Sequence, residues 1–305
     1  MAQLRSQIPA NVDNVDKKVT ALLDMNVKQL QPIFTKLFKK QSTSKKFERI
    51  VSMAPFGDVP QKPEGEEYAT DLIMQAWTKD ITPVEWGLMF EVTETAEEDD
   101  LEDILVKKSK FLVFSMRQVE DKTAALVFDN GFSTQTTADG VALYSTAHTL
   151  KRGGTAKNRP SSDADLSVTS LAQAFIDLDT DTKIESGQIV KPASGYYLHI
   201  HPANRFNAMR ILKSTLMPGE ANNDINPMKD LDITPVINPF LADTDAWFLV
   251  PKGKEENGLL YLERKPVYQP APMTDARTGN RLYKLRARET WDSVDWRNSY
   301  GSTGA

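Results

Sequence analysis

The sequence of 305 residues contains no cysteine and only three histidines. The lack of cysteine excludes disulfide bonds, thiolate metal sites and cysteine nucleophiles, and it is compatible with folding in a reducing cytosol. The amino terminus also lacks the apolar run of a signal peptide, and apolar segments such as 124–128 are far too short to span a bilayer. We therefore expect a protein that has no membrane partner and stays in the cell that makes it.

A strong positive charge is missing as well. The formal net charge is −5 and the pI is near 5.4, which argues against sequence-independent nucleic-acid binding by the whole surface. The charge is uneven, because residues 1–50 hold ten Lys and Arg against four Asp and Glu, whereas residues 51–100 hold two against thirteen. Two interpretations are open: two solvated faces, or a basic arm and an acidic segment that meet between copies of the chain and make assembly salt-sensitive.

The amino-terminal arm carries two helical patterns. The apolar content of the whole chain, 40%, is ordinary for a folded protein, and its length suits one large domain or two closely connected ones. Apolar residues recur at helical spacing in 12–23 and again in 30–38. These patterns predict two short amphipathic helices, whose apolar stripes must be buried on the body or on a neighbour.

The segment 42–92 is interrupted repeatedly by proline and glycine. It contains three strand-like pieces, at 47–53, 68–79 and 86–92. About fifty residues of hairpin-like chain cannot easily form a core of their own. We predict that this segment extends away from the body and packs on another molecule.

A long helix is predicted after this segment. Thr95 and Glu98 have the spacing of a capping box, and apolar residues then recur at about 3.6-residue intervals. The pair Asn130-Gly131 supplies a stop signal. A helix of roughly 30 residues would be about 45 Å long.

The rest of the chain alternates between short helices and strands, which predicts an α+β fold rather than a regular doubly wound one. Helices are predicted at 166–178 and 203–214, and strands at 143–145, 196–200, 233–236, 246–250, 259–268 and 281–291. The last two strands flank a turn-rich loop at 270–280 and are expected to form a hairpin that returns to the long helix.

Few residues suggest metal chemistry. His199 and His201 lie two apart on a predicted strand, so both rings would face one side, but no third ligand is identifiable nearby in the sequence. Asp243 and Asp245 match the start of a calcium loop that lacks its glycine and its final glutamate. Packing or surface histidines and a simple turn are the preferred interpretations.

Catalytic and nucleotide-binding patterns are equally incomplete. Ser145 and His148 lack a nucleophile elbow, and the basic loop 151–157 lacks the spacing of a phosphate loop. The tryptophans have mostly strand-like contexts, which favour core or interface anchors over base stacking; they are Trp77, Trp86, Trp247, Trp291 and Trp296. We therefore assign no catalytic, cofactor-binding or metal-binding residue.

Six segments stand out by the order of their residues. They are LYSTAH at 143–148, NRPSSDADL at 158–166, PGEANNDIN at 218–226, NPFLADTDAWFL at 238–249, YLER at 261–264 and DWRNSYGS at 295–302. Together they resemble the major head subunits of tailed bacteriophages, in particular the family of the phage Mu major head protein. The resemblance runs from about residue 45 to the end of the chain.

The resemblance implies the Johnson fold, also called the Hong Kong ninety-seven type capsid fold. This α+β fold has an N-terminal arm, an extended E-loop hairpin, a long spine helix in the P domain and a mixed α/β A domain. The implied division is 1–46 for the arm, 47–92 for the E-loop, 93–140 for the P domain with its spine helix, 141–257 for the A domain and 258–305 for the P-domain return strands. The A domain, with the loop 218–226, is expected near the capsomer axes.

The implied function is that of a major capsid protein, not an enzyme, which assembles through pentamers and hexamers into the icosahedral head of a tailed phage. The implied partners are further copies of the chain, a scaffolding protein, a portal, a decoration or cement protein, and double-stranded DNA that is packaged without sequence-specific binding. The protein would be assembled in the host cytoplasm and reside in the virion capsid.

Two other classes of protein stay open at this point. An encapsulin-type compartment has the same fold but encloses enzyme cargo instead of DNA. A soluble α+β enzyme would remain a monomer or small oligomer, and it would lose activity when Ser145, His148, His199 or His201 is substituted.

Overall fold

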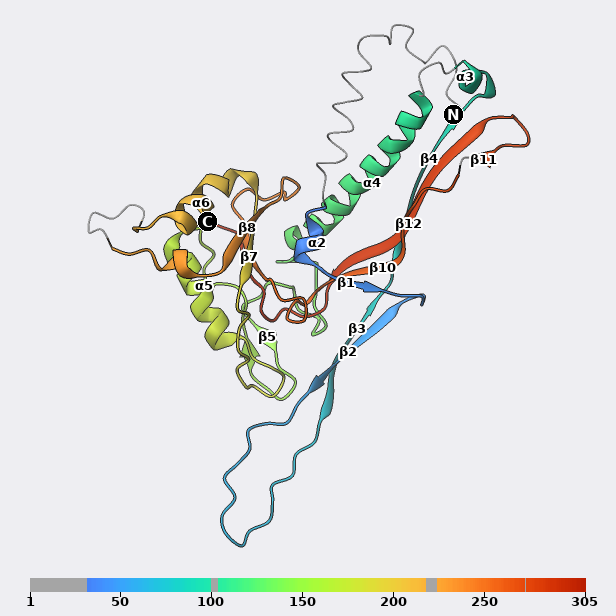
Figure 1. Cartoon of the computed structure of the whole chain (residues 1–305). Coiled ribbons are helices and arrows are strands. Elements are labelled where there is room, and N and C mark those ends of the chain that lie inside the picture. The colour runs from blue at the N-terminus through green and yellow to red at the C-terminus, as the bar shows by residue number, and fades with distance from the viewer. Residues whose placement is uncertain (1–31, 100–103, 218–223, 272) are drawn as a thin grey trace.

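The computed structural model describes residues 32–99, 104–217, 224–271 and 273–305. The chain forms an elongated lobe, a more compact lobe, and a long hairpin that projects from the region where the two lobes meet (Figure 1). Within the described residues, no helix is both long enough and apolar enough to cross a membrane. The helix expected at 12–23 lies outside the described residues.

The elongated lobe is built on a five-stranded sheet. Its centre is an antiparallel pair, β10 (Leu259–Tyr268) and β12 (Arg281–Ser293), which confirms the hairpin predicted for the last two long strands. β4 (Val84–Val92) pairs with β12 along its whole length. β1 (Lys39–Ser42) runs parallel to β10, and β11 (Met273–Thr274) pairs with the start of β12.

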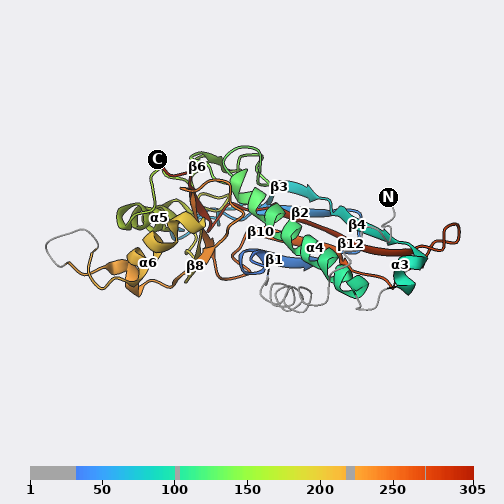
Figure 2. The ribbon, with the colours of Figure 1, turned by 90° about the horizontal axis from the view of Figure 1, so that it is seen from above.

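A long helix, α4 (Ile104–Asp129), lies across this sheet (Figure 2). Residues of β12 alternate between buried and half-buried, so every second side chain faces the helix. Leu285 and Ala287 of β12 share a buried cluster with Leu112 and Met116 of α4. The 26 described residues of α4 give a length of about 39 Å.

α4 ends where the sequence predicted, immediately before Asn130-Gly131. A Cβ atom at Gly131 would lie 2.8 Å from the Tyr144 ring and 2.9 Å from the carbonyl oxygen of Phe128, so only glycine fits there. The helix stop is therefore also a point of close packing between the two lobes.

The start of the helix differs from the prediction of one helix beginning at Thr95. A short helix, α3 (Glu94–Glu98), ends before a turn at Asp99, and α4 begins separately at Ile104. Residues 100–103, which lie between the two helices, are outside the described residues.

The compact lobe contains a four-stranded sheet in the order β13-β9-β7-β8. These strands are β7 (Tyr196–Ile200), β8 (Ile233–Ile237), β9 (Trp247–Pro251) and β13 (Tyr300–Ser302). Two helices, α5 (Val168–Asp181) and α6 (Arg205–Lys213), share a buried cluster with Leu198 of β7 and Leu249 of β9. Ser167 caps α5 by accepting from the Ser170 N–H, which fixes the helix start.

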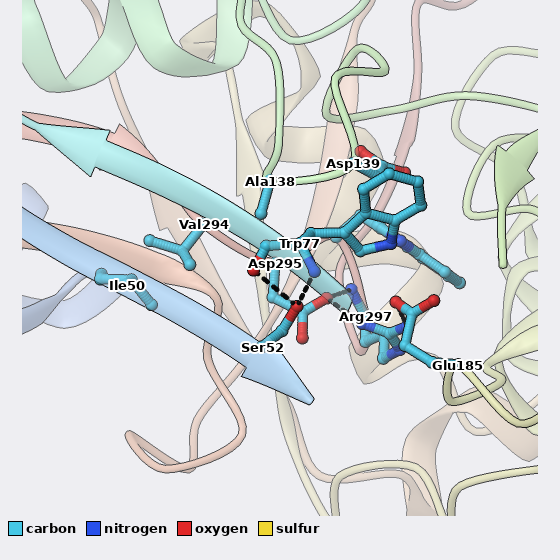
Figure 3. A pocket seen from close by; sticks show the side chains of 10 residues that line it. Ile50, Ser52, Trp77, Ala138, Asp139, Glu185, Val294, Asp295 and Arg297 are labelled. Atoms are coloured by element: carbon cyan, nitrogen blue, oxygen red, sulfur yellow. Dashed lines mark hydrogen bonds and ion pairs between the residues drawn. The ribbon is translucent and has the colours of Figure 1, made fainter. Parts of the chain in front are cut away.

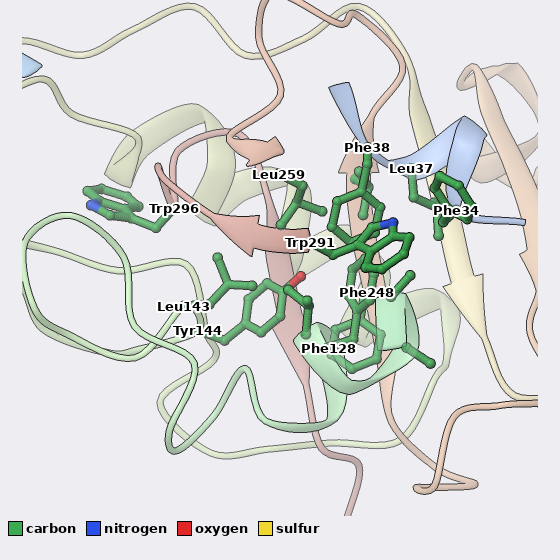
Figure 4. Close-up of a cluster of buried hydrophobic side chains, with 14 of the residues drawn as sticks. Phe34, Leu37, Phe38, Phe128, Leu143, Tyr144, Phe248, Leu259, Trp291 and Trp296 are labelled. Atoms are coloured by element: carbon green, nitrogen blue, oxygen red, sulfur yellow. The ribbon is translucent and has the colours of Figure 1, made fainter. Parts of the chain in front are cut away.

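The other face of this sheet belongs to a second core, which joins the two lobes (Figure 4). Phe248 of β9 is fully buried there, with ring centroids 5.2 Å from Phe128 at the end of α4 and 5.3 Å from Tyr144. The arm contributes Phe38, whose ring centroid lies 5.8 Å from that of Phe128. Residues of β9 are therefore buried on both faces of the sheet.

Two predicted elements of the compact lobe need correction. The strand expected at 143–145 is irregular chain, because the Leu143 and Tyr144 N–H groups donate to Gln135 and Gly131 carbonyls in neighbouring turns. The helix expected at 203–214 begins as a 3-10 turn, η2 (Pro202–Asn204), and continues as α6. A second 3-10 turn, η3 (Pro227–Asp230), precedes β8, and β5 (His148–Thr149) pairs with β6 (Thr155–Ala156).

The projecting hairpin consists of β2 (Glu48–Ala54), β3 (Met74–Ile81) and the loop 55–73 between them. β3 begins later than the predicted 68–79 strand, because pairing with β2 starts only at Met74. Two residues separate β3 from β4, which belongs to the sheet of the elongated lobe. The described part of the arm enters through α2 (Phe34–Leu37), within the helix predicted at 30–38.

Candidate assembly surfaces

His199 and His201 lie in different surroundings and share no ligand geometry. The His199 ring is fully buried, and neither ring nitrogen has a hydrogen-bond partner among the described residues. Its centroid lies 4.4 Å from that of Phe128, and burial lowers the pKa of His199 to about 3, so the ring is neutral. His201 caps η2 by accepting from the Ala203 N–H at 3.2 Å. Across the described ranges, no three His, Cys, Asp or Glu side chains are grouped so as to hold a metal ion.

His148 is held by hydrogen bonds rather than paired with Ser145. Its Nδ1 lies 2.7 Å from Asp139 Oδ2, its Nε2 lies 3.1 Å from Asn158 Oδ1, and its ring stacks on Trp296 at 4.3 Å. Ser145 Oγ accepts instead from the Ala147 N–H. The geometry is that of a buried structural histidine, and it assembles no nucleophile and base.

Asp243 forms a turn. Its Oδ1 accepts from the Asp245 N–H at 3.0 Å and from the Ala246 N–H at 3.3 Å, which leads the chain into β9. The calcium-loop pattern in the sequence is therefore an Asx turn at a strand start.

The basic loop 151–157 is shaped by Gly153 and Gly154, which have φ values of 100° and 89°. It projects Lys151 and Arg152 toward the hairpin. Arg152 Nη1 donates to Asp71 Oδ1 at 2.8 Å, and Lys151 Nζ lies 4.7 Å from the centre of the Trp77 ring. The loop therefore contacts another part of the same chain.

The tryptophans anchor packing. Trp247, Trp291 and Trp296 are buried in the two cores described above, and Trp247 Nε1 donates to the Ala164 carbonyl at 3.0 Å. Trp86 and Trp77 are half-buried at the sheet and at the hairpin. This agrees with the sequence interpretation as core or interface anchors.

The root of the arm is fixed by the long helix. Asp121 of α4 accepts from the backbone N–H groups of Ile33 at 2.8 Å and Phe34 at 3.2 Å, so a buried carboxylate caps α2. Burial raises the pKa of Asp121, and these two backbone hydrogen bonds oppose that rise. The Phe34 ring lies 4.9 Å from Tyr261 and 5.3 Å from Trp291. This cap was not predictable from the sequence, because Asp121 is one polar residue within an amphipathic helix.

A cluster of carboxylates lies beside this root. Glu289 of β12 is fully buried and accepts from the Tyr261 hydroxyl at 2.6 Å, while its Oε1 has no partner among the described residues. Burial raises the pKa of Glu289 to about 7, and the nearby carboxylates of Glu120 and Glu263 add to the rise. Glu120 in turn accepts from Arg117 at 2.7 Å. Only the strict alternation of β12 could have indicated that Glu289 faces inward.

Several arm and hairpin charges are paired within the chain. Lys39 contacts Glu255 at 2.8 Å, and Lys40 contacts Glu263 at 2.7 Å. In the hairpin, Arg49 of β2 contacts Asp80 of β3 through two hydrogen bonds of 2.7 Å. Some charges of the basic arm and of the acidic segment are therefore neutralised by partners in the same chain.

The hairpin exposes apolar side chains that its own body does not cover. Val59 is 93% exposed, Tyr68 82% and Leu72 77%, and all three lie in the loop 55–73. On the outward face of β2, Val51 and Met53 are also exposed. Scattered exposed apolar residues are normal, but their concentration in one projecting hairpin makes the hairpin a candidate interaction surface.

Comparisons with known proteins give one family. The family model described as phage capsid protein matches residues 76–300. A comparison with curated protein sequences finds no match.

Solved structures supply the fold. The capsid of the cyanophage P-SCSP1u has a TM-score of 0.62 at 12% identity, covering 90% of this chain and 88% of that chain. The capsid of a native GTA particle has a TM-score of 0.56 at 14% identity, covering 90% of both chains. Mycobacterium phage Adephagia has a TM-score of 0.57 at 11% identity, also covering 90% of both. Such identities show a shared fold, and the α+β Johnson fold predicted from the sequence is confirmed.

Proposed function

Because this chain belongs to the phage capsid protein family, we propose that copies of it assemble through pentamers and hexamers into the icosahedral head that encloses a tailed phage's DNA. The chain is a major capsid protein, a structural protein located in the virion capsid. The family match favours this function over an encapsulin-type compartment and over a soluble enzyme. A closer relation to the phage Mu head subunit stays a prediction.

The observation that best supports assembly is the exposed apolar surface of the hairpin loop 55–73. Leaving Tyr68 and Leu72 in water in a free subunit forgoes burial worth about 25 cal/mol per Å2 of apolar area. A neighbouring subunit can cover these side chains, because the same patch recurs on every copy around a symmetry axis. We propose that the hairpin is the main tie between neighbouring subunits.

We propose the division 1–46, 47–92, 93–140, 141–257 and 258–305 for the arm, E-loop, P domain, A domain and P-domain return strands. The pairing of β4 with β12 supports a narrower hairpin that ends at Ile81, with β4 acting as a strand of the P domain. The proposed position of the loop 218–226 near the capsomer axes concerns residues that lie mainly outside the described ranges.

Charge supports a salt-sensitive assembly. The loop 55–73 contains five Asp and Glu residues against one Lys. We propose that this acidic loop and the basic arm approach each other between subunits, where complementary charge steers association. Lys39 and Lys40 form ion pairs within the chain and are not counted on for these contacts.

Further partners follow from the proposed function. We propose a scaffolding protein, a portal and a decoration or cement protein, with assembly in the host cytoplasm. Packaged double-stranded DNA would be enclosed without sequence-specific binding, since the net negative charge of the chain disfavours tight phosphate contacts. We propose no enzymatic activity.

Electron microscopy of the expressed protein tests this proposal. Closed shells are expected, alone or with the scaffolding protein, and their yield should fall between low and high salt. A Leu72→Ser variant should form few shells, whereas Ile176→Ser, an exposed apolar residue on α5, should assemble like the unsubstituted chain. The absence of shells even with scaffold present would overturn the proposed function.

A further inference from the structure

The hairpin is held against its own subunit at three levels along its length. At its base, Lys79 Nζ donates to Asp292 Oδ1 at 2.6 Å and to the carbonyl oxygens of Thr136 at 2.6 Å and Ser293 at 2.7 Å. The Lys79 side chain is mostly buried and lies at the junction with the body. This base contact fixes where the hairpin leaves the body.

The middle of the hairpin lies against the compact lobe around a small cavity (Figure 3). Ile50, Ser52 and Trp77 of the hairpin form one wall. Glu185 and Arg297 of the body line the other side and form an ion pair of 2.7 Å. The cavity volume is about 40 Å3, so the two surfaces fit closely.

A third set of contacts lies where the loop 55–73 leaves the two strands, and it converges on Asp71. Its carboxylate accepts from the Gly57 N–H at 2.8 Å and from its neighbour Leu72 N–H at 2.7 Å, which ties the two arms of the loop together. Arg152 of the body donates to the same carboxylate at 2.8 Å and to the Leu72 carbonyl at 2.6 Å. The Arg152 guanidinium thus binds both a side chain and the backbone of the hairpin.

A second contact at this level comes from another loop of the body. Gln188 Nε2 donates to Asp58 Oδ1 at 2.7 Å. Arg152 and Gln188 lie on adjacent chain segments, because the Arg152 N–H donates to the Glu185 carbonyl and the Lys151 N–H to the Glu185 side chain. The two loops therefore form one docking surface, which we call the clasp: Lys151, Arg152 and Gln188.

We propose that the clasp is an intramolecular docking site that holds the acidic hairpin at one angle in the free subunit and so presents the hairpin's apolar side chains to a neighbour. This inference rests on the proposed function, since the hairpin must have a neighbour to bind. It also gives a role to the basic loop 151–157, whose Gly153 and Gly154 allow the sharp bend that projects Arg152.

The chemistry of the clasp suits a reversible contact. Its ion pair is partly exposed, with side-chain exposures of 20% for Arg152 and 40% for Asp71, and such pairs are individually weak and screened by salt. The hairpin is held against the body by several weak contacts along its length and by the buried contacts of Lys79 at its base. The tip is thus free to adjust when a neighbouring subunit binds, whereas the base stays in place.

Spin labels can measure the hairpin angle directly, since the chain has no native cysteine. We suggest Val59→Cys in the loop 55–73 and Ile176→Cys on α5, both exposed positions, in the unassembled full-length subunit. Double electron–electron resonance should give one narrow distance distribution. Arg152→Glu, which places a carboxylate beside Asp71, should broaden the distribution and raise the open population about three- to tenfold.

Matched variants separate the clasp from general effects. Arg49→Gln removes an ion pair within the hairpin and should leave the distance unchanged, whereas Gln188→Ala should broaden it less than Arg152→Glu does. If Arg152→Glu fails to fold, Arg152→Ala in combination with Gln188→Ala replaces it. Identical distributions for the clasp variants and the unsubstituted protein would overturn the proposal.

The clasp and the proposed function fail in different ways. Absence of shells from the unsubstituted protein would count against the proposed function, while the distance measurement on free subunits still decides whether the clasp exists. If the hairpin opens in Arg152→Glu but shells form at the same rate and yield, the clasp has no role in assembly and the proposal is wrong. We expect Arg152→Glu to assemble more slowly than the unsubstituted protein, and a higher concentration of subunits to restore the rate.

Discussion

The four-stranded sheet of the compact lobe and the projecting hairpin are both built of β-strands, but they differ in how much of their apolar surface is buried. All five residues of β9 are buried, since helices cover one face and the joint core covers the other. In the hairpin, β2 alternates between exposed and half-buried residues, and the loop beyond it exposes large apolar side chains. In the sheet, the buried apolar surface stabilises the subunit. In the hairpin, the apolar surface is exposed and is available to a neighbouring subunit, as proposed above.

Substitution of Phe248 in β9 should cause the largest loss of stability in either region. Phe248→Ala leaves a cavity among the rings of Phe128, Phe132 and Tyr144, and should lower the free energy of unfolding by about 3–5 kcal/mol. Urea unfolding of the free subunit, followed by tryptophan fluorescence, measures the loss. A loss as small as that of a hairpin-loop substitution would contradict the difference between the two regions.

Because His199 is buried in the same sheet, the free energy of unfolding should depend on pH. Its native pKa is lowered to about 3 by burial, so between pH 6.5 and 3 the unfolded chain binds a proton that the native ring does not. Stability therefore falls as the pH drops through this window, by about 1.4 kcal/mol per unit at most. His199→Leu removes this contribution, so its advantage over the unsubstituted protein should grow from pH 7 to pH 4. Equal urea midpoints for the two proteins at pH 4 would argue against a buried neutral ring.

Glu289 should give stability the opposite dependence on pH. Burial raises its native pKa to about 7, so the native state holds a proton that the unfolded state loses above pH 4.5. Stability should fall as the pH rises from about 4.5 to 7, and Glu289→Gln should gain about 1–3 kcal/mol at pH 8 and little at pH 5. Thermal or urea unfolding at these two pH values checks the sign. Glu85→Gln is a useful control, because Glu85 is an exposed carboxylate on the neighbouring strand β4.

Leu72 of the hairpin should have the smallest effect on the subunit itself. Leu72→Ser in the free protein should change the free energy of unfolding by no more than about 0.5 kcal/mol, because the side chain is 77% exposed. Shell assembly by the same variant should fall about tenfold, as expected when a buried contact of an interface is lost. Light scattering during assembly, beside urea unfolding, separates the two quantities. Comparable losses in both would show that the loop belongs to the core.

The sequence predicted the regular elements well and the long-range contacts poorly. The strands at 196–200 and 259–268 match β7 and β10, because short runs of aliphatic and aromatic residues favour buried strands. The strand expected at 143–145 failed, since a short apolar run is equally suited to a buried loop whose backbone bonds to nearby turns. The contact between Arg152 and Asp71 was out of reach, because 81 positions separate the two residues.

The projecting hairpin was predicted for the right physical reason, and its contact with another subunit stays a prediction. Frequent proline and glycine with little helical pattern indicated a segment without a core of its own, and the structure has a projecting hairpin there. The internal pairing of charges was not predictable, since the net charge of a segment does not reveal which partners its side chains take. Lys39 and Lys40 pair with glutamates more than two hundred positions away.

The short link between β3 and β4 makes the hairpin a lever. β3 ends at Ile81 and β4 begins at Val84, and Pro83 in the link restricts its own φ angle and the conformation of Thr82 before it. A stiff joint of two residues transmits torque instead of absorbing it. If a neighbouring subunit binds the loop 55–73 as proposed, any load that exceeds the adjustment of the loop would pass through this joint to β4, which pairs along its whole length with β12.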